Sequence, residues 1–148
     1  MFKSKKTIIC AAVIVCVCAA VLMSAFCSPR RAAERVFRQN EAALNQMVSD
    51  YLAGDMQALK REIDGVSDVD FYTGEHAMIE FFVKGRGIAP ASVYYGFYYS
   101  PDGVPLAFQN AKNGLVPSGN GWEWKAGGDN RGYTEQISGN WYYYEASF

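Results

Sequence analysis

The chain has 148 residues and carries 14 Lys and Arg against 15 Asp and Glu, with one histidine and four cysteines. This balance disfavours a nucleic-acid-binding surface, which needs clustered positive charge. A single histidine provides no histidine pair for zinc. All four cysteines precede residue 28, so the later sequence offers neither a disulfide nor a thiolate metal site. We therefore expect no metal, no cofactor and no nucleic-acid partner.

The first feature along the chain is an uncharged run between Lys6 and Arg30, TIICAAVIVCVCAAVLMSAFCSP. As a helix, the run would rise about 35 Å, enough to cross a hydrocarbon core of about 30 Å. It is also longer than the apolar core of an ordinary signal peptide, which has about 7–15 residues. We predict a cytoplasmic leader over residues 1–6 and a transmembrane helix, or uncleaved signal anchor, over residues 7–27.

The charges on the two sides of this run bear on its orientation. Lysines lie before it and arginines after it, so the positive-inside rule sets one group against the other. A short lysine-bearing leader ahead of an apolar run is typical of signal sequences and favours a cytoplasmic N-terminus. We predict a single-pass protein of the cell membrane with an extracytoplasmic C-terminal domain. The alternatives are a tethered domain that faces the cytoplasm and a protein that is secreted after signal cleavage.

Residues 28–66 are predicted to be helical. Ser28 and Pro29 provide a hydroxyl cap followed by proline at the first helical position. Gly54 interrupts the helix, and Asp55 is placed to cap a second, shorter helix that Gly65 would end. Apolar residues recur at helical spacing in the first helix and form one stripe: Ala33, Val36, Phe37, Leu44, Met47, Val48, Tyr51 and Leu52.

The composition changes after residue 66, where Tyr, Phe, Trp, Val and Gly replace helix formers. Turn clusters such as KGRG, PSGNG and SGN separate short apolar segments, a pattern typical of an antiparallel sheet. The predicted strands are 68–72, 78–84, 92–100, 104–109, 121–125, 133–137 and 141–146.

The predicted fold class is therefore α+β. A transmembrane helix leads into an amphipathic helix and a short second helix. These helices pack on a curved antiparallel sheet, a meander of about five to seven strands. Residues 28–66 and 67–148 form one domain, since each apolar surface needs the other as its cover.

The segment VYYGFYYSPDG, residues 93–103, concentrates aromatic side chains ahead of a turn. The residues SPDG suit a three-residue hairpin loop. We therefore expect strand 92–100 to pair with strand 104–109. In that register Gly96 would face Phe108 and leave room for its ring.

Aromatic side chains also provide the candidate interaction surface. Along the predicted hairpin they alternate between the two faces of the sheet, and both faces are apolar, whereas a sheet covered on one side has polar residues on the other. Either the helical stripe covers the second face or that face is open to a ligand. The candidate surface comprises Tyr95, Phe97, Tyr99, Trp122, Trp124, Trp141 and Tyr143.

The sequence contains no catalytic constellation that we recognise. His76 stands in a loop without a second histidine, and no cysteine is available as a nucleophile after residue 28. No GxSxG elbow and no phosphate-binding loop occurs. We predict that the protein is not an enzyme. The first hypothesis is a membrane-tethered binding module whose partner is a protein, a peptide or cell-wall glycan.

The order of the predicted elements supports a second hypothesis. A hydrophobic N-terminal helix that runs into an amphipathic helix and then into an antiparallel sheet resembles, in outline, the architecture of type IV pilins. The resemblance implies a self-assembling structural subunit. It covers the layout alone, because the glycine before the processing site and the glutamate early in the apolar helix, which pilins carry, do not occur between Thr7 and Cys27.

Overall fold

The computed structural model describes residues 28–88 and 91–148. The predicted leader and transmembrane helix, residues 1–27, lie outside the described residues. Within the described ranges, no helix is both long enough and apolar enough to cross a membrane. The described chain forms one long helix packed on a seven-stranded antiparallel sheet, which confirms the α+β class.

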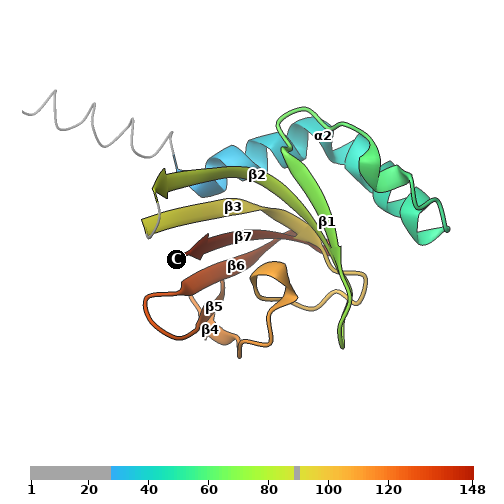
Figure 1. Ribbon diagram of the computed structural model, residues 1–148. Helices are drawn as coiled ribbons and strands as arrows, with labels where there is room; N and C mark the ends of the chain where they lie inside the picture. The colour runs from blue at the N-terminus through green and yellow to red at the C-terminus, as the bar shows by residue number, and fades with distance from the viewer. Residues whose placement is uncertain (1–27, 89–90) are drawn as a thin grey trace, which may run out of the picture.

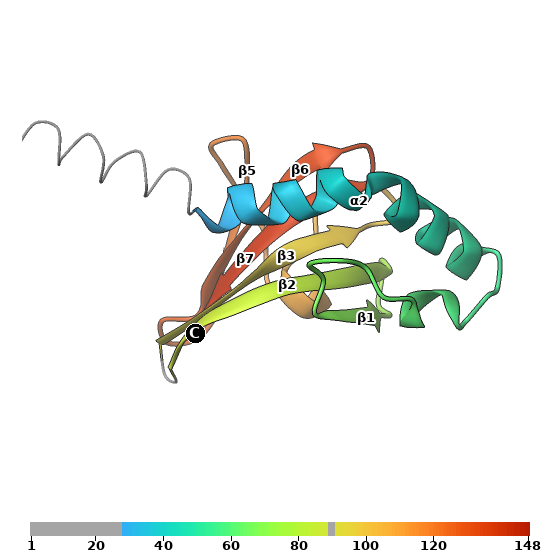
Figure 2. The same cartoon turned by 90° about the horizontal axis from the view of Figure 1, so that it is seen from above.

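The helix α2 (Pro29–Leu52) begins at the predicted start signal. Ser28 is its N-cap, with an extended backbone and a hydroxyl that accepts a hydrogen bond from the Arg31 N–H at 3.4 Å. Figures 1 and 2 show α2 lying across one face of the sheet. The apolar stripe faces that sheet, and its buried members are Ala33, Phe37, Leu44, Met47 and Val48.

The predicted second helix is not formed. Only a single 3₁₀ turn, η1 (Ala58–Lys60), follows α2. Asp55 does not cap this turn as predicted: the N-cap is Gln57, which makes no side-chain cap hydrogen bond, and the Asp55 carboxylate accepts the Gln57 N–H at 3.0 Å just before the turn begins. Arg61 then binds Asp50 and Asp55 and closes the turn against the end of α2. A helix of two turns is unstable unless it buries a broad apolar face, and this segment turns back before one can form.

The seven strands lie in the spatial order β1-β2-β3-β7-β6-β5-β4, and every neighbouring pair is antiparallel. Strands β1 to β3 form one meander and β4 to β7 form another, and the two meet at the β3–β7 pair. The predicted single meander is therefore wrong, because the chain crosses from β3 to the far edge before it returns. The strands are β1 (Asp68–Tyr72), β2 (Met78–Ile88), β3 (Ala91–Tyr99), β4 (Val116–Ser118), β5 (Gly121–Lys125), β6 (Arg131–Ser138) and β7 (Trp141–Ser147).

The predicted hairpin between residues 92–100 and 104–109 is also wrong. The SPDG turn forms, but β3 pairs with β2 and β7. Residues 104–109 contain no strand and lead into a 3₁₀ turn, η2 (Phe108–Asn110). The physical reason lies in the Tyr98 hydroxyl, which accepts the Leu106 N–H at 2.8 Å. The backbone of this segment thus bonds to a side chain that rises from the sheet and not to a strand edge.

Aromatic side chains fill the face of the sheet beneath α2. Tyr95 and Phe97 are buried there, together with Trp141. Phe37 of α2 meets Phe97 edge to face with ring centroids 5.6 Å apart. The helical stripe is therefore the cover of this face, and the aromatic run is a core strand.

The opposite face of the sheet is covered by the segment that includes η2. Its buried residues include Tyr98, Tyr142 and Tyr144, and Leu106 and Phe108 pack onto them. Tyr98 and Tyr142 stack with ring centroids 5.1 Å apart. In Figure 1 this segment lies on the side of the sheet away from α2. The sheet is thus a middle layer with a cover on each face, which explains why both faces are apolar.

Gly96, in the middle of β3, marks a close approach between strands. It pairs with Phe82 of β2 and Tyr144 of β7, not with Phe108 as predicted. The β2 register shifts just after Phe82, a β-bulge. The Phe81 carbonyl oxygen occupies the space that a Cβ at residue 96 would need. Glycine is required here for space and not for its freedom of rotation.

We predict that Gly96→Ala destabilises the fold by about 1–3 kcal/mol, because the new Cβ forces the Phe81 backbone to move. Urea unfolding of the full chain in a nonionic detergent measures this. Gly127→Ala is the matched control, since a Cβ there meets nothing within 4 Å. Equal stability of the two variants would show that the close approach at Gly96 is wrong.

Candidate ligand-binding site

Glu80 interrupts an otherwise apolar run in β2, MIEFFV, residues 78–83. Alternation puts it on the face away from α2, where Asp70 of β1 and Tyr98 of β3 are its neighbours in register. Only 4% of Glu80 is exposed. Burial of a carboxylate is costly unless it is hydrogen-bonded or paired with a charge, so its surroundings decide its ionisation.

The Glu80 carboxylate holds a strained turn. Its Oε2 accepts the Gln109 N–H at 3.0 Å. Gln109 and Asn110 both have a φ of 52°, in the left-handed region that residues other than glycine rarely adopt. Asn110 is fixed by donating from Nδ2 to the His76 carbonyl at 2.8 Å, whereas Gln109 is fixed through Glu80. Strain of this kind persists where the surrounding structure enforces it, and it is frequent at binding sites.

The hydroxyl of Tyr144 is a second unusual group beside Glu80. Tyr144 is 1% exposed, and its Oη has no hydrogen-bond partner among the described residues. Burial, and then the negative charge of Glu80, raise the pKa of Tyr144 well above its ordinary value. Gly96 leaves room for this hydroxyl, which a Cβ would approach to 3.0 Å. A buried donor without a partner is unusual in a folded protein, and it places a second polar group in the layer that holds Glu80.

Burial raises the pKa of Glu80 to about 7. The Gln109 N–H and the Tyr144 hydroxyl oppose this shift because they favour the ionised form, while the negative charge of Asp70 adds to it. Near neutral pH, Glu80 is therefore divided between its neutral and ionised forms. A positive ligand that arrives at this site can fix the negative form at little cost.

Glu80 and Gln109 line a surface cleft of about 410 Å³, named here the Glu80 cleft, whereas Tyr144 lies behind its lining. Aromatic rings form its walls, and Tyr94 and Phe108 stack with ring centroids 6.3 Å apart. No Lys or Arg is among the described residues that line it. Carboxylates beside aromatic faces suit an organic cation, through charge attraction and cation–π contact. The lining residues are Asp68, Asp70, Glu80, Phe82, Tyr94, Phe108, Gln109 and Phe148.

A metal ion is a poorer fit for the Glu80 cleft. The described residues contain no group of three or more His, Cys, Asp or Glu side chains placed to hold one. Asp68 and Asp70 are exposed on β1, whereas Glu80 is buried and bonded to Gln109. Calcium needs about six to eight oxygen ligands around one point. The geometry therefore favours an organic cation.

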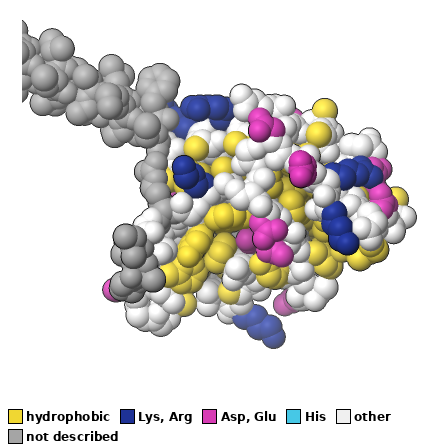
Figure 3. Space-filling view, turned by 45° about the horizontal axis from the view of Figure 1, so that its top comes forward, with side chains coloured by type: hydrophobic (Ala, Val, Ile, Leu, Met, Phe, Trp, Pro, Cys, Tyr) yellow, Lys and Arg dark blue, Asp and Glu magenta, His cyan; other side chains and the backbone are white. Residues whose placement is uncertain are grey.

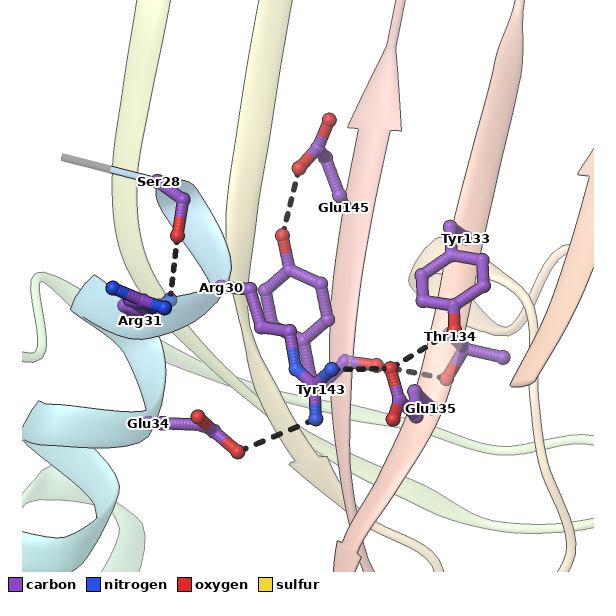
Figure 4. A network of polar contacts seen from close by, with 9 residues as sticks. All are labelled: Ser28, Arg30, Arg31, Glu34, Tyr133, Thr134, Glu135, Tyr143 and Glu145. Atoms are coloured by element: carbon purple, nitrogen blue, oxygen red, sulfur yellow. Dashed lines mark hydrogen bonds and ion pairs between the residues drawn. The ribbon is translucent and has the colours of Figure 1, made fainter. Parts of the chain in front are cut away.

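A second polar cluster lies where α2 begins (Figure 4). Arg30 binds Glu135 of β6 at 2.9 Å and Glu34 of α2 at 3.4 Å. Tyr133 donates its hydroxyl to the same Glu135 carboxylate at 2.9 Å. A groove of about 350 Å³ runs beside Tyr133. Because the Arg30 and Glu135 charges are paired with each other, the cluster fixes the start of α2 to β6 and offers less to a ligand than the Glu80 cleft does.

Basic side chains gather at the same end of the domain. Arg31, Arg35 and Arg38 are exposed on α2. Figure 3 shows Lys and Arg side chains beside the start of this helix. Positive charge here and negative charge in the Glu80 cleft give the domain two distinct electrostatic surfaces.

Most of the predicted aromatic surface lies inside the domain. Tyr99 and Trp122 are half-buried at the borders of the two cores. The other five residues are buried. Trp124 is buried on the face away from α2. Four are buried beneath α2: Tyr95, Phe97, Trp141 and Tyr143. These rings form no open platform, because each face of the sheet has its own cover.

Sequence reasoning did not find the Glu80 cleft. One signal was present, since Glu80 is the only charged residue in the run 78–83. Its companions are far away in the chain, at residues 68–70, 108–109 and 148. The β1–β2 register, the path of η2 and the pairing of β7 with β3 together bring them to one place.

The chain matches no family model, no curated protein and no solved structure.

We predict that Glu80 makes folding stability fall as pH rises. The pKa of Glu80 is about 7 in the folded protein against an ordinary value of 4.5. The folded state therefore binds the proton more tightly, so this contribution is complete below pH 4.5 and is lost between pH 4.5 and 7. The loss is on the order of 3 kcal/mol.

Glu80→Gln keeps an acceptor for the Gln109 N–H and removes the charge. Urea unfolding from pH 4 to pH 8 should show a flatter profile for this variant, with a gain in stability over the wild type at pH 8. Glu41→Gln, on the exposed side of α2, is the control and should follow the wild type. An unchanged profile for Glu80→Gln would contradict the assignment.

Proposed function

We propose that the chain is a membrane-tethered, extracytoplasmic binding module that holds a positively charged group of its partner in the Glu80 cleft and carries out no reaction. The observation that carries this proposal is a buried carboxylate that holds a strained turn beside aromatic walls. A cation that enters the cleft meets Glu80, Asp68 and Asp70, and it lies against the rings of Tyr94 and Phe108.

Glu80 suits binding better than proton transfer. A general base needs a free acceptor aimed at a substrate proton. In contrast, Oε2 of Glu80 accepts the Gln109 N–H, and the carboxyl group also lies beside the Tyr144 hydroxyl. The hydrogen bond from Gln109 strengthens when Glu80 is ionised, because charge-assisted bonds are the stronger ones. A bound cation would thus tighten the strained turn that forms one wall of its own site.

The tether in this proposal is the uncharged run of residues 7–27. α2 begins at Pro29, directly after the run. The exposed Arg31, Arg35 and Arg38 follow within the first three turns of the helix. Arginines close to a membrane span can contact anionic lipid headgroups. The Glu80 cleft is on the other side of the sheet from α2, where it stays free for a partner.

We expect a reporter enzyme fused after Phe148 to be active when the reporter works only outside the cytoplasm. A reporter that works only inside the cytoplasm is the matched control and should be inactive in the same fusion. Both fusions should fractionate with membranes, because the run of residues 7–27 is long enough to span the bilayer. The opposite reporter pattern would place the domain in the cytoplasm, and soluble full-length protein without detergent would contradict the tether.

We predict that the full chain in nonionic detergent binds n-butylammonium, an organic cation of the shape of a lysine side chain, in the Glu80 cleft. The expected Kd is on the order of 1 mM, as befits a five-atom ligand. Binding should be several-fold tighter at pH 8 than at pH 6, because the Glu80 pKa of about 7 leaves the carboxyl mostly protonated at pH 6. Chemical shifts of the Tyr94 and Phe108 rings report binding.

Three comparisons make this test specific. Glu80→Gln should weaken binding at pH 8 and remove its pH dependence, whereas Glu41→Gln should leave both unchanged. Neutral n-butanol should bind more weakly than the amine at pH 8. Equal binding of the amine to the wild type and to Glu80→Gln would overturn the proposal.

A further inference from the structure

The Glu80 cleft opens beside an outer strand of the sheet. β1 pairs with β2 on one side only and is the first strand in the spatial order. Figure 2 shows no other strand along its outer side. β4, at the opposite edge, has three residues, and Pro117 in the middle of it carries no backbone N–H. β1 has five residues and no proline, so it is the better of the two edges for a further strand.

The two faces of β1 differ in chemistry. Asp68 and Asp70 point to the side of the Glu80 cleft, where Asp70 is directly opposite Glu80 in the register. Val69 and Phe71 point to the side of α2. The Phe71 ring packs against Tyr51 at 5.1 Å between centroids, yet 38% of Phe71 remains exposed. The edge therefore presents acids on one face and an open apolar ring on the other.

We propose that β1 pairs with an extended peptide in which basic and apolar residues alternate. The peptide adds an outer strand, its Lys or Arg side chains lie beside Asp68 and Asp70 with one of them in the Glu80 cleft, and its apolar side chains lie on Phe71. This inference rests on the proposed function and names the partner class. Main-chain hydrogen bonds provide affinity in this mode of recognition, and alternate side chains provide specificity.

Charge decides between this partner and a second copy of the chain. Two copies that paired through β1 would bring Asp68 and Asp70 of each close to the same acids of the other. Like charges placed opposite each other across a strand pair are destabilising, whereas opposite charges stabilise it. Acidic side chains on an edge strand thus oppose self-association and favour a basic strand.

The test uses the full chain in nonionic detergent at pH 8 and the acetylated, amidated peptide Thr-Lys-Val-Lys-Val-Lys-Thr. Two further peptides carry backbone N-methyl groups, one on all lysines and one on both valines. In an extended strand, the N–H groups of alternate residues point to opposite edges. One methylated peptide therefore loses the N–H groups that face β1, while the other keeps them with the same charge.

We expect the parent peptide to bind at least tenfold more tightly than n-butylammonium. One methylated peptide should lose at least tenfold in affinity, and the other should bind like the parent. Hydrogen exchange of β1 amides should slow when the parent binds. Asp70→Asn should weaken the peptide several-fold, with Asp129→Asn, in an exposed turn far along the chain, as the control. A peptide with glutamate in place of each lysine should not bind.

Two results would overturn the inference. If n-butylammonium binds as expected but the two methylated peptides bind as well as the parent, the Glu80 cleft takes a cation and β1 takes no strand. If neither the amine nor any peptide binds, the proposed function fails together with the inference. The two failures are therefore distinguishable.

Discussion

The contact between Phe37 and the aromatic rings at the centre of the sheet holds the domain together. Phe37 reaches Phe97 at 5.6 Å and Trp141 at 5.3 Å between ring centroids, and Phe81 stacks on Phe97 at 5.4 Å. These rings come from α2, β2, β3 and β7, so one cluster joins the helix to both meanders. Aromatic pairs in offset or edge-to-face geometry add to the burial of their large surfaces. Without this cluster, the β3–β7 junction would lose its cover.

The second face of the sheet has a different construction because its cover is an irregular segment. Such a segment has backbone groups that need partners, and side chains of the sheet provide them. The Tyr98 hydroxyl accepts a hydrogen bond from the Leu106 N–H, and the Glu80 carboxylate accepts one from the Gln109 N–H. Tyr98 accepts its hydrogen bond while its hydroxyl is neutral. Glu80, in contrast, brings an ionisable carboxyl group into an apolar layer. The buried ionisable group of the Glu80 cleft is thus a result of how an irregular cover is attached to a sheet.

The sequence predicts α2 and six of the seven strands, all but β4, because their signals are local. Ser28 and Pro29 start the helix, and the stripe that contains Phe37 and Leu44 shows which side is buried. The SPDG turn gives a local signal that misleads, since a turn does not determine which strand its residues join. Pairing with β7 brings Tyr98 beside Tyr142 and Gly96 beside Tyr144, and that choice depends on contacts over about 45 residues of chain.

The candidate site was harder to predict than the fold for the same reason. Glu80 is visible as a charge in an apolar run, yet its partner Gln109 and the cleft wall at Phe148 give no sign of their positions in the sequence. The positive φ of Gln109 is equally hidden, because glutamine has no preference for it. Sequence propensities report which backbone conformations a residue adopts at low energy. This site is built on a strained turn that distant residues enforce.

The attachment of α2 to the sheet also has a mechanical consequence. The helix is held at its start by the ion pair of Arg30 with Glu135 and, in its second half, by a hydrogen bond of 2.9 Å from the Trp141 indole N–H to Asn45. Phe37 holds it between these two points. A force applied at Ser28 along the helix axis would load these attachments together in shear, because the helix has to slide along the sheet before any of them can break alone. A force applied at right angles would peel them one after another. The attachments of α2 should therefore resist a pull along the helix axis better than a pull at right angles to it.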